Sequence, residues 1–277
     1  DGTVLLFTAK EEGRTGAQGT PVIGSNGDGD GLDMQVLVWW DQATPDLAQT
    51  LLDYTGLPDV DGTLLTGICL DGGAGRQVAP GVFAVVANEA ANADLNADAD
   101  NGDNILLLID TTTTPPTVHR PTFGAQSGVQ PVGSGSIPLT GINDDSGMIV
   151  RLPGGGPNPG IGATDTVLGY ISFSDLDTVV LLDRGGDAAA LAGGRIAVTV
   201  TEALTPGTGV SGFSMRIYQT DGTVLFDGPC WQHSKPVTET GSLWAYFRFE
   251  GLVNGEDTDM NGDGDKSDVI VAAWKDD

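Results

Sequence analysis

Apolar residues along the chain recur in short runs that alternate with polar residues and predict β-strands. Runs of this length, rich in Val, Ile and aromatic residues and bounded by Gly, Asp and Pro, are typical of strands. Five runs begin alike, with a small residue leading into the apolar stretch, and we call them opener strands: residues 3–10, 82–88, 148–152, 195–201 and 243–249. Four openers end in a glutamate, namely Glu11, Glu89, Glu202 and Glu250. The third opener runs into Gly-Pro sequence instead.

A second strand follows each opener after a loop of variable length. The second strands span residues 36–40, 105–109, 167–173, 213–218 and 269–274. An aspartate stands close behind each of them: Asp41, Asp110, Asp175, Asp221 and Asp276. A third apolar run appears at residues 64–70, 137–142, 179–182 and 224–226. The sequence therefore predicts one β-repeat domain over residues 1–277, with units of approximately 1–75, 76–140, 141–190, 191–237 and 238–277.

Two insertions lengthen the first two units. In residues 44–54, Thr44 is a suitable N-cap, Pro45 a suitable first helical residue, and Leu47 and Leu51 share one face. This segment is the one predicted helix. Residues 111–136 are rich in Thr, Pro, Gly and Ser without periodicity and are predicted to form a surface loop.

Units of three or four short strands cannot bury their apolar faces alone and must stack on neighbours. A closed ring of blades is the usual solution for repeats of about 50 residues. Consecutive Ig-like sandwiches are the competing architecture, but this repeat is about half as long as an Ig domain. We therefore predict an all-β fold, a β-propeller of about five blades with one short helical insertion.

The charge balance narrows the possible partners. The chain has 38 acidic and 12 basic residues and a formal net charge of −26, a surface that repels nucleic acid. No apolar run approaches the roughly 20 residues of a membrane helix, so membrane insertion is not expected. The start of the chain lacks a signal-peptide pattern, and we expect a mature secreted chain. Cys69 and Cys230 could form one disulfide in an oxidising compartment or remain free thiols.

The most informative chemistry lies in loops that precede second strands. Two of these loops, DLNADADNGD and DMNGDGDKSD, place oxygen-bearing side chains at relative positions 1, 3, 5, 7 and 10. The ten residues are Asp94, Asn96, Asp98, Asp100 and Asp103 in the first loop, and Asp259, Asn261, Asp263, Asp265 and Asp268 in the second. A partial copy has Gly24 at position 1 and continues with Asn26, Asp28, Asp30 and Asp33.

This pattern points to calcium, Ca²⁺, as the bound cofactor. Alternate residues in a tight, Gly-rich turn can direct carboxylates around a hard cation that takes about six to eight oxygen ligands. Without a cation, each nearby pair of carboxylates would repel by about 1 kcal/mol even in water. Magnesium demands a stricter octahedron, and zinc favours His or Cys, which both loops lack. An acidic Asp-Gly turn without an ion is the alternative.

The motif D-x-N-x-D-x-D-x-x-D before an apolar strand resembles the calcium loops of FG-GAP and VCBS-type β-propeller repeats, including those of integrin α-subunits. The loop in this chain is one residue longer before its last Asp, and the Phe-Gly signature of those repeats is missing. EF-hand and dockerin loops share the first three positions but not the later ligand or the flanking helices. The resemblance implies an extracellular scaffold stiffened by calcium and does not imply a particular ligand.

The glutamates behind the openers could be catalytic carboxylates of a propeller glycosidase. A residue that recurs at one place in successive units is better explained by the construction of the unit, either capping a loop donor or completing a metal shell. His119 and His233 lack an accompanying G-x-S-x-G serine motif and are weak candidates for a general base. No catalytic set stands out, and no enzymatic activity is predicted.

The sequence thus predicts a secreted calcium-binding β-repeat module with a structural or adhesive role at the cell surface. Its expected partners are copies of itself, in a fibre or surface layer, or other extracellular material. A glycan-binding or glycan-cleaving β-propeller is the alternative, in which exposed tryptophans would stack on sugars.

Overall fold

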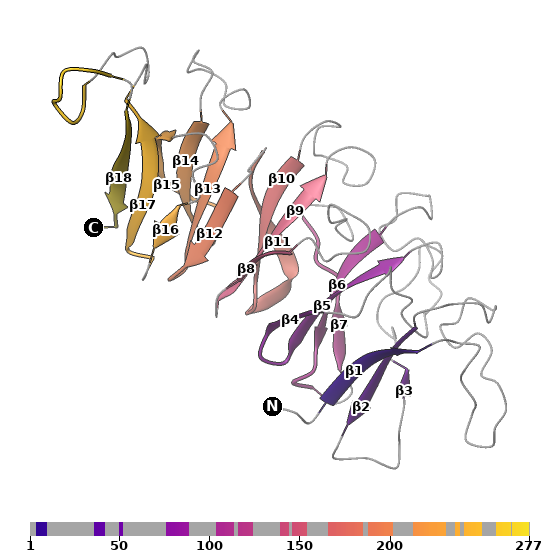
Figure 1. The fold of residues 1–277 in the computed structure, drawn as a ribbon. Coiled ribbons are helices and arrows are strands. Elements are labelled where there is room, and N and C mark those ends of the chain that lie inside the picture. The colour runs from indigo at the N-terminus through magenta and orange to yellow at the C-terminus, as the bar shows by residue number, and fades with distance from the viewer. Residues whose placement is uncertain are drawn as a thin grey trace, which may run out of the picture. The chain divides into compact units, whose positions relative to one another are not determined.

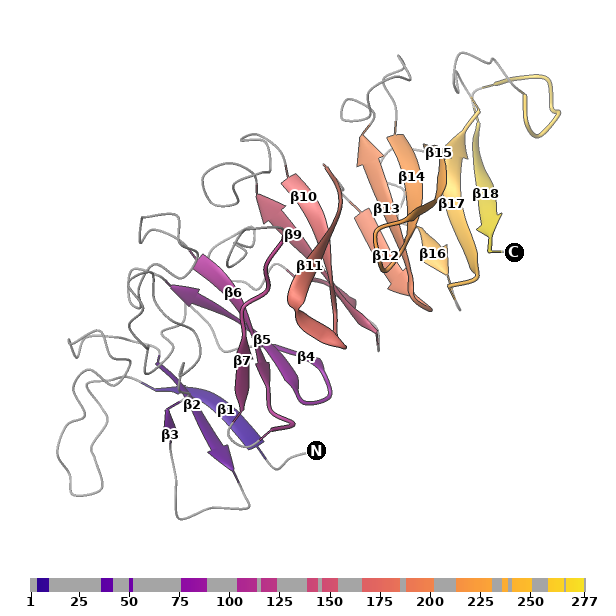
Figure 2. The same ribbon diagram turned by 180° about the vertical axis from the view of Figure 1, so that it is seen from behind.

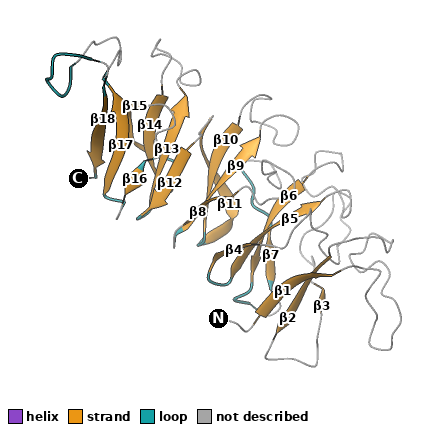
Figure 3. Cartoon of the chain, in the orientation of Figure 1, coloured by secondary structure: helices purple, strands orange, loops and turns teal. Residues whose placement is uncertain are grey.

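All secondary structure in the described part of the chain is β-strand (Figure 3). This computed structural model describes residues 4–9, 36–41, 50–51, 76–88, 104–113, 116–123, 139–143, 146–153, 166–184, 188–201, 213–230, 236–238, 241–250, 259–266 and 268–276. The predicted all-β class is therefore confirmed. The strands form five antiparallel sheets, and none of these sheets closes on itself, so the propeller ring remains a prediction.

Each sheet contains strands that follow one another in the sequence (Figure 1). The first sheet contains β1 (Val4–Ala9), β2 (Val36–Asp41) and β3 (Thr50–Leu51), and the second contains β4 (Arg76–Ala79), β5 (Val82–Asn88), β6 (Asn104–Asp110) and β7 (Thr117–His119). The third contains β8 (Leu139–Asn143), β9 (Gly147–Pro153), β10 (Thr166–Ser172) and β11 (Asp175–Arg184). The fourth contains β12 (Ala188–Ala192), β13 (Arg195–Thr201), β14 (Phe213–Gln219) and β15 (Val224–Cys230), and the fifth β16 (Val237–Thr238), β17 (Leu243–Phe249) and β18 (Val269–Lys275).

The predicted repeat appears as a common ladder at the centre of each sheet. The opener strands β5, β9, β13 and β17 each pair with the next strand through seven residue pairs, the first residue of one opposite the last of the other. Strands β1 and β2 pair through six residue pairs, again with the first residue of one strand opposite the last residue of the other. Because the register is shared, positions can be compared between sheets: Arg195 pairs with Gln219 as Leu243 pairs with Lys275.

Two predicted insertions differ from the structure. Thr50 and Leu51, inside the predicted helix, form strand β3 and pair with β2. The helix prediction is therefore wrong for these two residues, because pairing with an open sheet edge outweighs the weak preference of a short segment for helix. The rest of residues 44–54 lies outside the described part. In the predicted loop 111–136, Thr117–His119 forms β7 at the edge of the second sheet.

The chain divides into two compact units. Unit 1 comprises Asp1–Pro138, Gly155–Gly160 and Asp175–Thr178, and unit 2 comprises Leu139–Gly154, Ile161–Ser174 and Val179–Asp277. In unit 1, the consecutive residues Ala84, Val85, Leu106 and Leu107 of the β5–β6 ladder are all buried. Consecutive residues of a strand face opposite sides, so this ladder is covered on both faces.

Unit 2 is a stack of three sheets in chain order, with the β12–β15 sheet in the middle (Figures 1 and 2). Toward β9 and β10, the middle sheet contributes the first of two clusters, in which Ile196, Val198 and Tyr218 pack with Ile149 and Tyr170. Because successive side chains of a strand point to opposite faces, the intervening residues of the middle sheet point the other way and pack against the last sheet.

The second cluster joins the middle sheet to the β16–β18 sheet. Met215 and Ile217 of β14 pack with Trp244 and Tyr246 of β17, and all four side chains are buried. The indole Nε1 of Trp244 donates a 2.7 Å hydrogen bond to the carbonyl oxygen of Gly241. The buried tryptophan therefore has its polar atom satisfied, as the apolar setting requires.

Cys230 belongs to the same cluster and is a free, buried thiol. Burial raises its pKa to about 12, against the opposing effect of a hydrogen bond with Thr199. The thiol is therefore protonated and unreactive at neutral pH. Of the two alternatives for the cysteines, the structure has the free thiol at Cys230, and Cys69 lies outside the described residues.

Among the described residues, no helix has the length and apolar character needed to cross a membrane.

Candidate metal centre

The second full acidic loop, residues 259–268, folds against the glutamate that follows the last opener. Glu250 comes directly after β17 and is 0% exposed. Its Oε1 accepts hydrogen bonds from the backbone N–H groups of Met260 at 2.9 Å and Asn261 at 2.8 Å. Its own backbone N–H donates to the carbonyl oxygen of Asp268 at 2.9 Å. Glu250 therefore caps loop donors, one of the two structural roles expected for the repeated glutamates.

The second carboxylate oxygen of Glu250, Oε2, is buried and has no hydrogen-bond partner among the described residues. One carboxylate oxygen each of Glu250, Asp265 and Asp268 lie within 4.8 Å of one another. Glu250 is buried, Asp268 half-buried and Asp265 exposed, so the group opens toward solvent on one side. This acidic triad could hold a metal ion.

The glycines of the loop allow its tight path. Gly262 and Gly264 have φ values of 77° and 95°, in the left-handed region that side chains other than glycine rarely adopt. Both carboxylate oxygens of Asp259 are engaged, because Gly262 N–H donates to Oδ1 at 2.6 Å and Gly264 N–H donates to Oδ2 at 2.9 Å. The loop is thus wound around the side chain at position 1.

Side chains at the next two positions continue this winding. The backbone N–H of Asp263 donates to Oδ1 of Asn261 at 3.0 Å, and that of Asp265 donates to Oδ1 of Asp263 at 3.0 Å. The Asn261 amide also donates to Oδ2 of Asp268 at 3.0 Å. Asn261 and Asp263, at positions 3 and 5 of the motif, thus each accept a hydrogen bond from the backbone N–H two residues further on, as in an Asx turn.

The crowding of carboxylates in the loop shifts two of them in opposite directions. The pKa of Asp263 is lowered, chiefly because the backbone N–H of Asp265 donates to it. The pKa of Asp268 is raised: the hydrogen bond from Asn261 lowers it, but the neighbouring carboxylates of Asp263 and Asp265 together outweigh that bond. A bound cation would relieve this repulsion.

The five predicted ligands of this loop fall into two groups by their contacts, and the Asn261 amide joins the groups through its hydrogen bonds to Asp263 and Asp268. Asp265 and Asp268, at positions 7 and 10, join Glu250 in the triad. Asp259, Asn261 and Asp263, at positions 1, 3 and 5, hold the loop backbone. The other predicted ligands lie outside the described residues: Asp94, Asn96, Asp98, Asp100, Asp103, Asn26, Asp28, Asp30 and Asp33.

The sequence analysis gave Glu250 two possible structural roles, capping a loop donor or completing a metal shell, but did not place it with particular ligands. The signal for that placement is the recurrence of a glutamate directly behind the openers, at Glu89 and Glu250 before the two full acidic loops. Glu250 is 15 residues before Asp265 in the sequence. Only the pairing of β17 with β18 shows that it lies beside the start of the second strand. In the structure, Phe249 pairs with Val269, so Glu250 stands next to Asp268.

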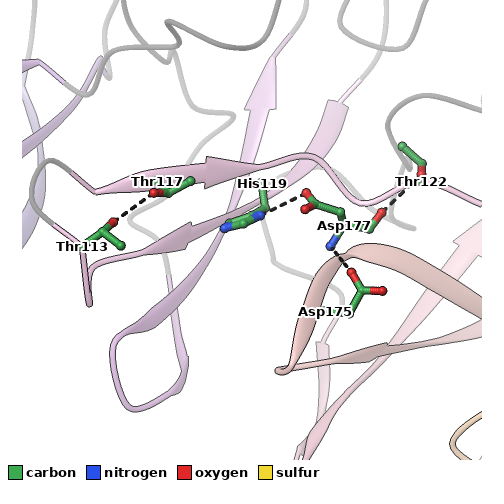
Figure 4. A network of polar contacts seen from close by, with 6 residues as sticks. All are labelled: Thr113, Thr117, His119, Thr122, Asp175 and Asp177. Atoms are coloured by element: carbon green, nitrogen blue, oxygen red, sulfur yellow. Dashed lines mark hydrogen bonds and ion pairs between the residues drawn. The ribbon is translucent and has the colours of Figure 1, made fainter.

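A second polar cluster lies in unit 1 and contains His119, a weak general-base candidate by sequence (Figure 4). The imidazole Nδ1 of His119 is 3.0 Å from Oδ1 of Asp177. The carbonyl oxygen of Asp177 accepts hydrogen bonds from the backbone N–H of Thr122 at 2.8 Å and from its hydroxyl at 3.2 Å. The backbone N–H of Asp177 donates to the Asp175 carboxylate at 3.2 Å. These bonds fasten residues 175–178 to the segment after β7, which is a structural use of the histidine.

The chain matches no protein-family model, no curated protein and no solved structure.

Proposed function

We propose that this chain is an extracellular structural or adhesive β-repeat module whose sheets are braced by bound calcium ions. The observation that carries the proposal is the buried Glu250 carboxylate, which lies beside Asp265 and Asp268 and whose Oε2 has no partner in the part of the chain that the structure describes. The brace acts within one sheet, so it is the same in a five-bladed propeller and in an open stack of sheets.

A buried, half-satisfied carboxylate is costly without a counter-charge. Removing such an ion from water carries an effective penalty of several kcal/mol. Without an opposite charge beside the carboxylate, nothing compensates that penalty. The two backbone N–H donors to Oε1 offset part of this cost, but no described residue donates to Oε2. A cation held between Glu250 and the two aspartates would satisfy Oε2 and relieve the repulsion among the three carboxylates.

The donor set favours calcium among the common cations. All three side chains offer carboxylate oxygens, and the group contains neither histidine nor cysteine. Calcium accepts irregular oxygen shells completed by backbone carbonyls and water, whereas magnesium requires a nearly regular octahedron. The exposed side at Asp265 leaves room for water ligands. The resemblance of the loop to calcium loops of extracellular propeller repeats supports the same ion and the same compartment.

Element boundaries support a second site of the same construction at the β5–β6 end. Glu89 follows β5 as Glu250 follows β17, and Asp103 directly precedes β6 as Asp268 directly precedes β18. We assign Asp100 and Asp103 the roles of Asp265 and Asp268. The partial loop departs from this arrangement, because Met34 and Gln35 separate Asp33 from the first residue of β2, whereas Asp268 directly precedes β18.

The test is a thermal melt in calcium and in excess chelator. We expect chelation to lower the Tm of the wild-type chain by about 10 °C or more, because ions that bind only the folded state stabilise it by mass action. Glu250→Gln removes the buried charge but keeps an oxygen for the two N–H donors. In chelator, the Tm of this variant should therefore equal or exceed that of the wild type. Calcium should raise the Tm of the variant much less than that of the wild type.

Glu202→Gln is the matched control, because Glu202 also follows an opener strand but precedes a loop without acidic residues at positions 203–212. This variant should keep the full calcium response. A wild-type melt that is the same in calcium and in chelator contradicts the proposed brace.

A further inference from the structure

The outer face of the last sheet is apolar and exposed. Leu243 and Phe247 of β17 are 53% and 48% exposed, and Val269 and Val271 of β18 are 45% and 70% exposed. Phe247 pairs directly with Val271, so these side chains share one face. Val237 of β16, 63% exposed, extends the same face because it pairs with Ala245. Contiguous exposed apolar surface of this kind marks an interaction site.

The matching face of the preceding sheet is covered. In the shared register, Met215 and Ile217 of β14 hold the positions of Val271 and Ala273 of β18. Both Met215 and Ile217 are 0% exposed, because the β16–β18 sheet packs on them. The face of β9 and β10 that carries Ile149 and Tyr170 is covered in the same way by the β12–β15 sheet. The stacking interface is thus repeated from sheet to sheet and continues onto the exposed face.

The leading sheet of the chain has the sequence that this face would receive. The last sheet uses Trp244, Tyr246 and Trp274 to pack on its predecessor, and the ring centroid of Trp274 is 6.2 Å from that of Phe226. In the shared register, β1 and β2 place Leu5, Phe7 and Trp40 at the positions of Trp244, Tyr246 and Trp274.

We propose that the outer face of β16–β18 binds the leading β1–β3 sheet of a second copy of this chain, so that copies assemble head to tail. In unit 2 taken by itself these side chains are exposed. The stacking interface that joins the sheets of this unit continues onto their face, and the proposed occupant is a further sheet of the same construction supplied by a second copy. A head-to-tail contact that does not close gives a linear fibre. The proposal refines the proposed structural role but does not depend on the metal.

Sedimentation velocity across a wide concentration range tests the assembly. The wild-type chain should form species that grow with concentration. Val271→Glu would bury a charge in the contact and should weaken association at least about a hundredfold. Val224→Glu is the matched control, because Val224 is 50% exposed but lies on β15 of the preceding sheet; it should assemble like the wild type. A wild-type chain that stays monomeric, or a Val271→Glu variant that assembles normally, overturns the proposal.

A cross-linking experiment tests which sheet covers the face. A photoreactive amino acid replaces Val271 in an equal mixture of ¹⁴N- and ¹⁵N-labelled chains, and mass spectrometry identifies the partner peptides. Cross-links between differently labelled chains, from position 271 to peptides of β1 and β2, support the proposal. Cross-links confined to one chain, as in a closed propeller, or between two β16–β18 sheets overturn it.

Both experiments are run in calcium and in chelator. A chain that melts higher in calcium but stays monomeric contradicts only the assembly proposal. A chain that assembles but melts identically in calcium and in chelator contradicts only the metal brace.

Discussion

The β12–β15 and β16–β18 sheets share one central ladder and differ in what surrounds it. Both have seven central pairs and a buried row of side chains facing the preceding sheet. In the β12–β15 sheet the opposite face is covered and the loop after Glu202 has no acidic residue. In the β16–β18 sheet that face is exposed, and the loop after Glu250 is the acidic one. The ladder is therefore the common scaffold, while the loop and the covering of the faces set the role of each sheet.

The largest expected effect comes from truncating equivalent positions on the two sheets. Met215→Ala should lower the free energy of unfolding by about 2–5 kcal/mol, because it leaves a cavity in a fully buried cluster. Val271→Ala, at the same register position, should cost less than about 1 kcal/mol, mainly through strand preference. Denaturant unfolding of dilute protein measures both. Equal losses would show that the outer face of the last sheet is covered within the chain.

A second comparison concerns two glycines with positive φ at turns of these sheets. Gly241 (φ +79°) has the backbone of Ala192 where a Cβ would be, whereas Gly194 (φ +70°) has nothing within 4 Å. Gly194→Ala should therefore cost about 1–2 kcal/mol from backbone strain alone. Gly241→Ala adds a clash between the two sheets and should cost at least about 1 kcal/mol more. A similar loss at both positions, measured in denaturant, would contradict close packing of these sheets.

The smallest expected effect concerns an ion pair that joins the two sheets. Arg195 contacts Oδ2 of Asp276 through Nε at 2.8 Å and Nη2 at 2.7 Å, with both side chains 29% exposed. Asp276→Asn should cost about 0.5–1 kcal/mol at low salt and less at high salt. The matched control is Asp227→Asn, which breaks the Arg216–Asp227 pair within one sheet, where the aspartate is more exposed, and should cost less. If Asp227→Asn lowers the free energy of unfolding more than Asp276→Asn does, the pair between the sheets is not the stronger one.

The sequence was sufficient for the central strands, because each contains a continuous or alternating series of apolar residues over five or more positions. It was not sufficient for β4, β12 and β16, whose segments RQVA, AAALA and VT have too little apolar character to indicate a strand without their partners. Strand β3 was missed for the same reason, since its two residues are strand only through pairing with β2. Edge strands of this kind depend on a neighbour that local sequence does not reveal.

The candidate metal centre was also only partly predictable. The spacing of the acidic loop indicated Asp265 and Asp268 because alternating oxygen donors in a tight, Gly-rich turn can surround a hard cation. It also predicted Asp259, Asn261 and Asp263 as ligands, which stays a prediction. Their described hydrogen bonds organise the loop backbone, and the Asn261 amide also donates to Asp268. Glu250 enters the site through the β17–β18 pairing, which is a long-range feature of the fold.

The most direct measurement is a crystal structure grown in calcium, with anomalous differences recorded at a wavelength where calcium scatters. The proposed brace predicts a calcium peak at about 2.3–2.6 Å from carboxylate oxygens of Glu250, Asp265 and Asp268, with Glu250 Oε2 among the ligands. A structure in which Glu250 Oε2 instead accepts a hydrogen bond from a protein donor or from water, with no anomalous peak beside it, would contradict the account.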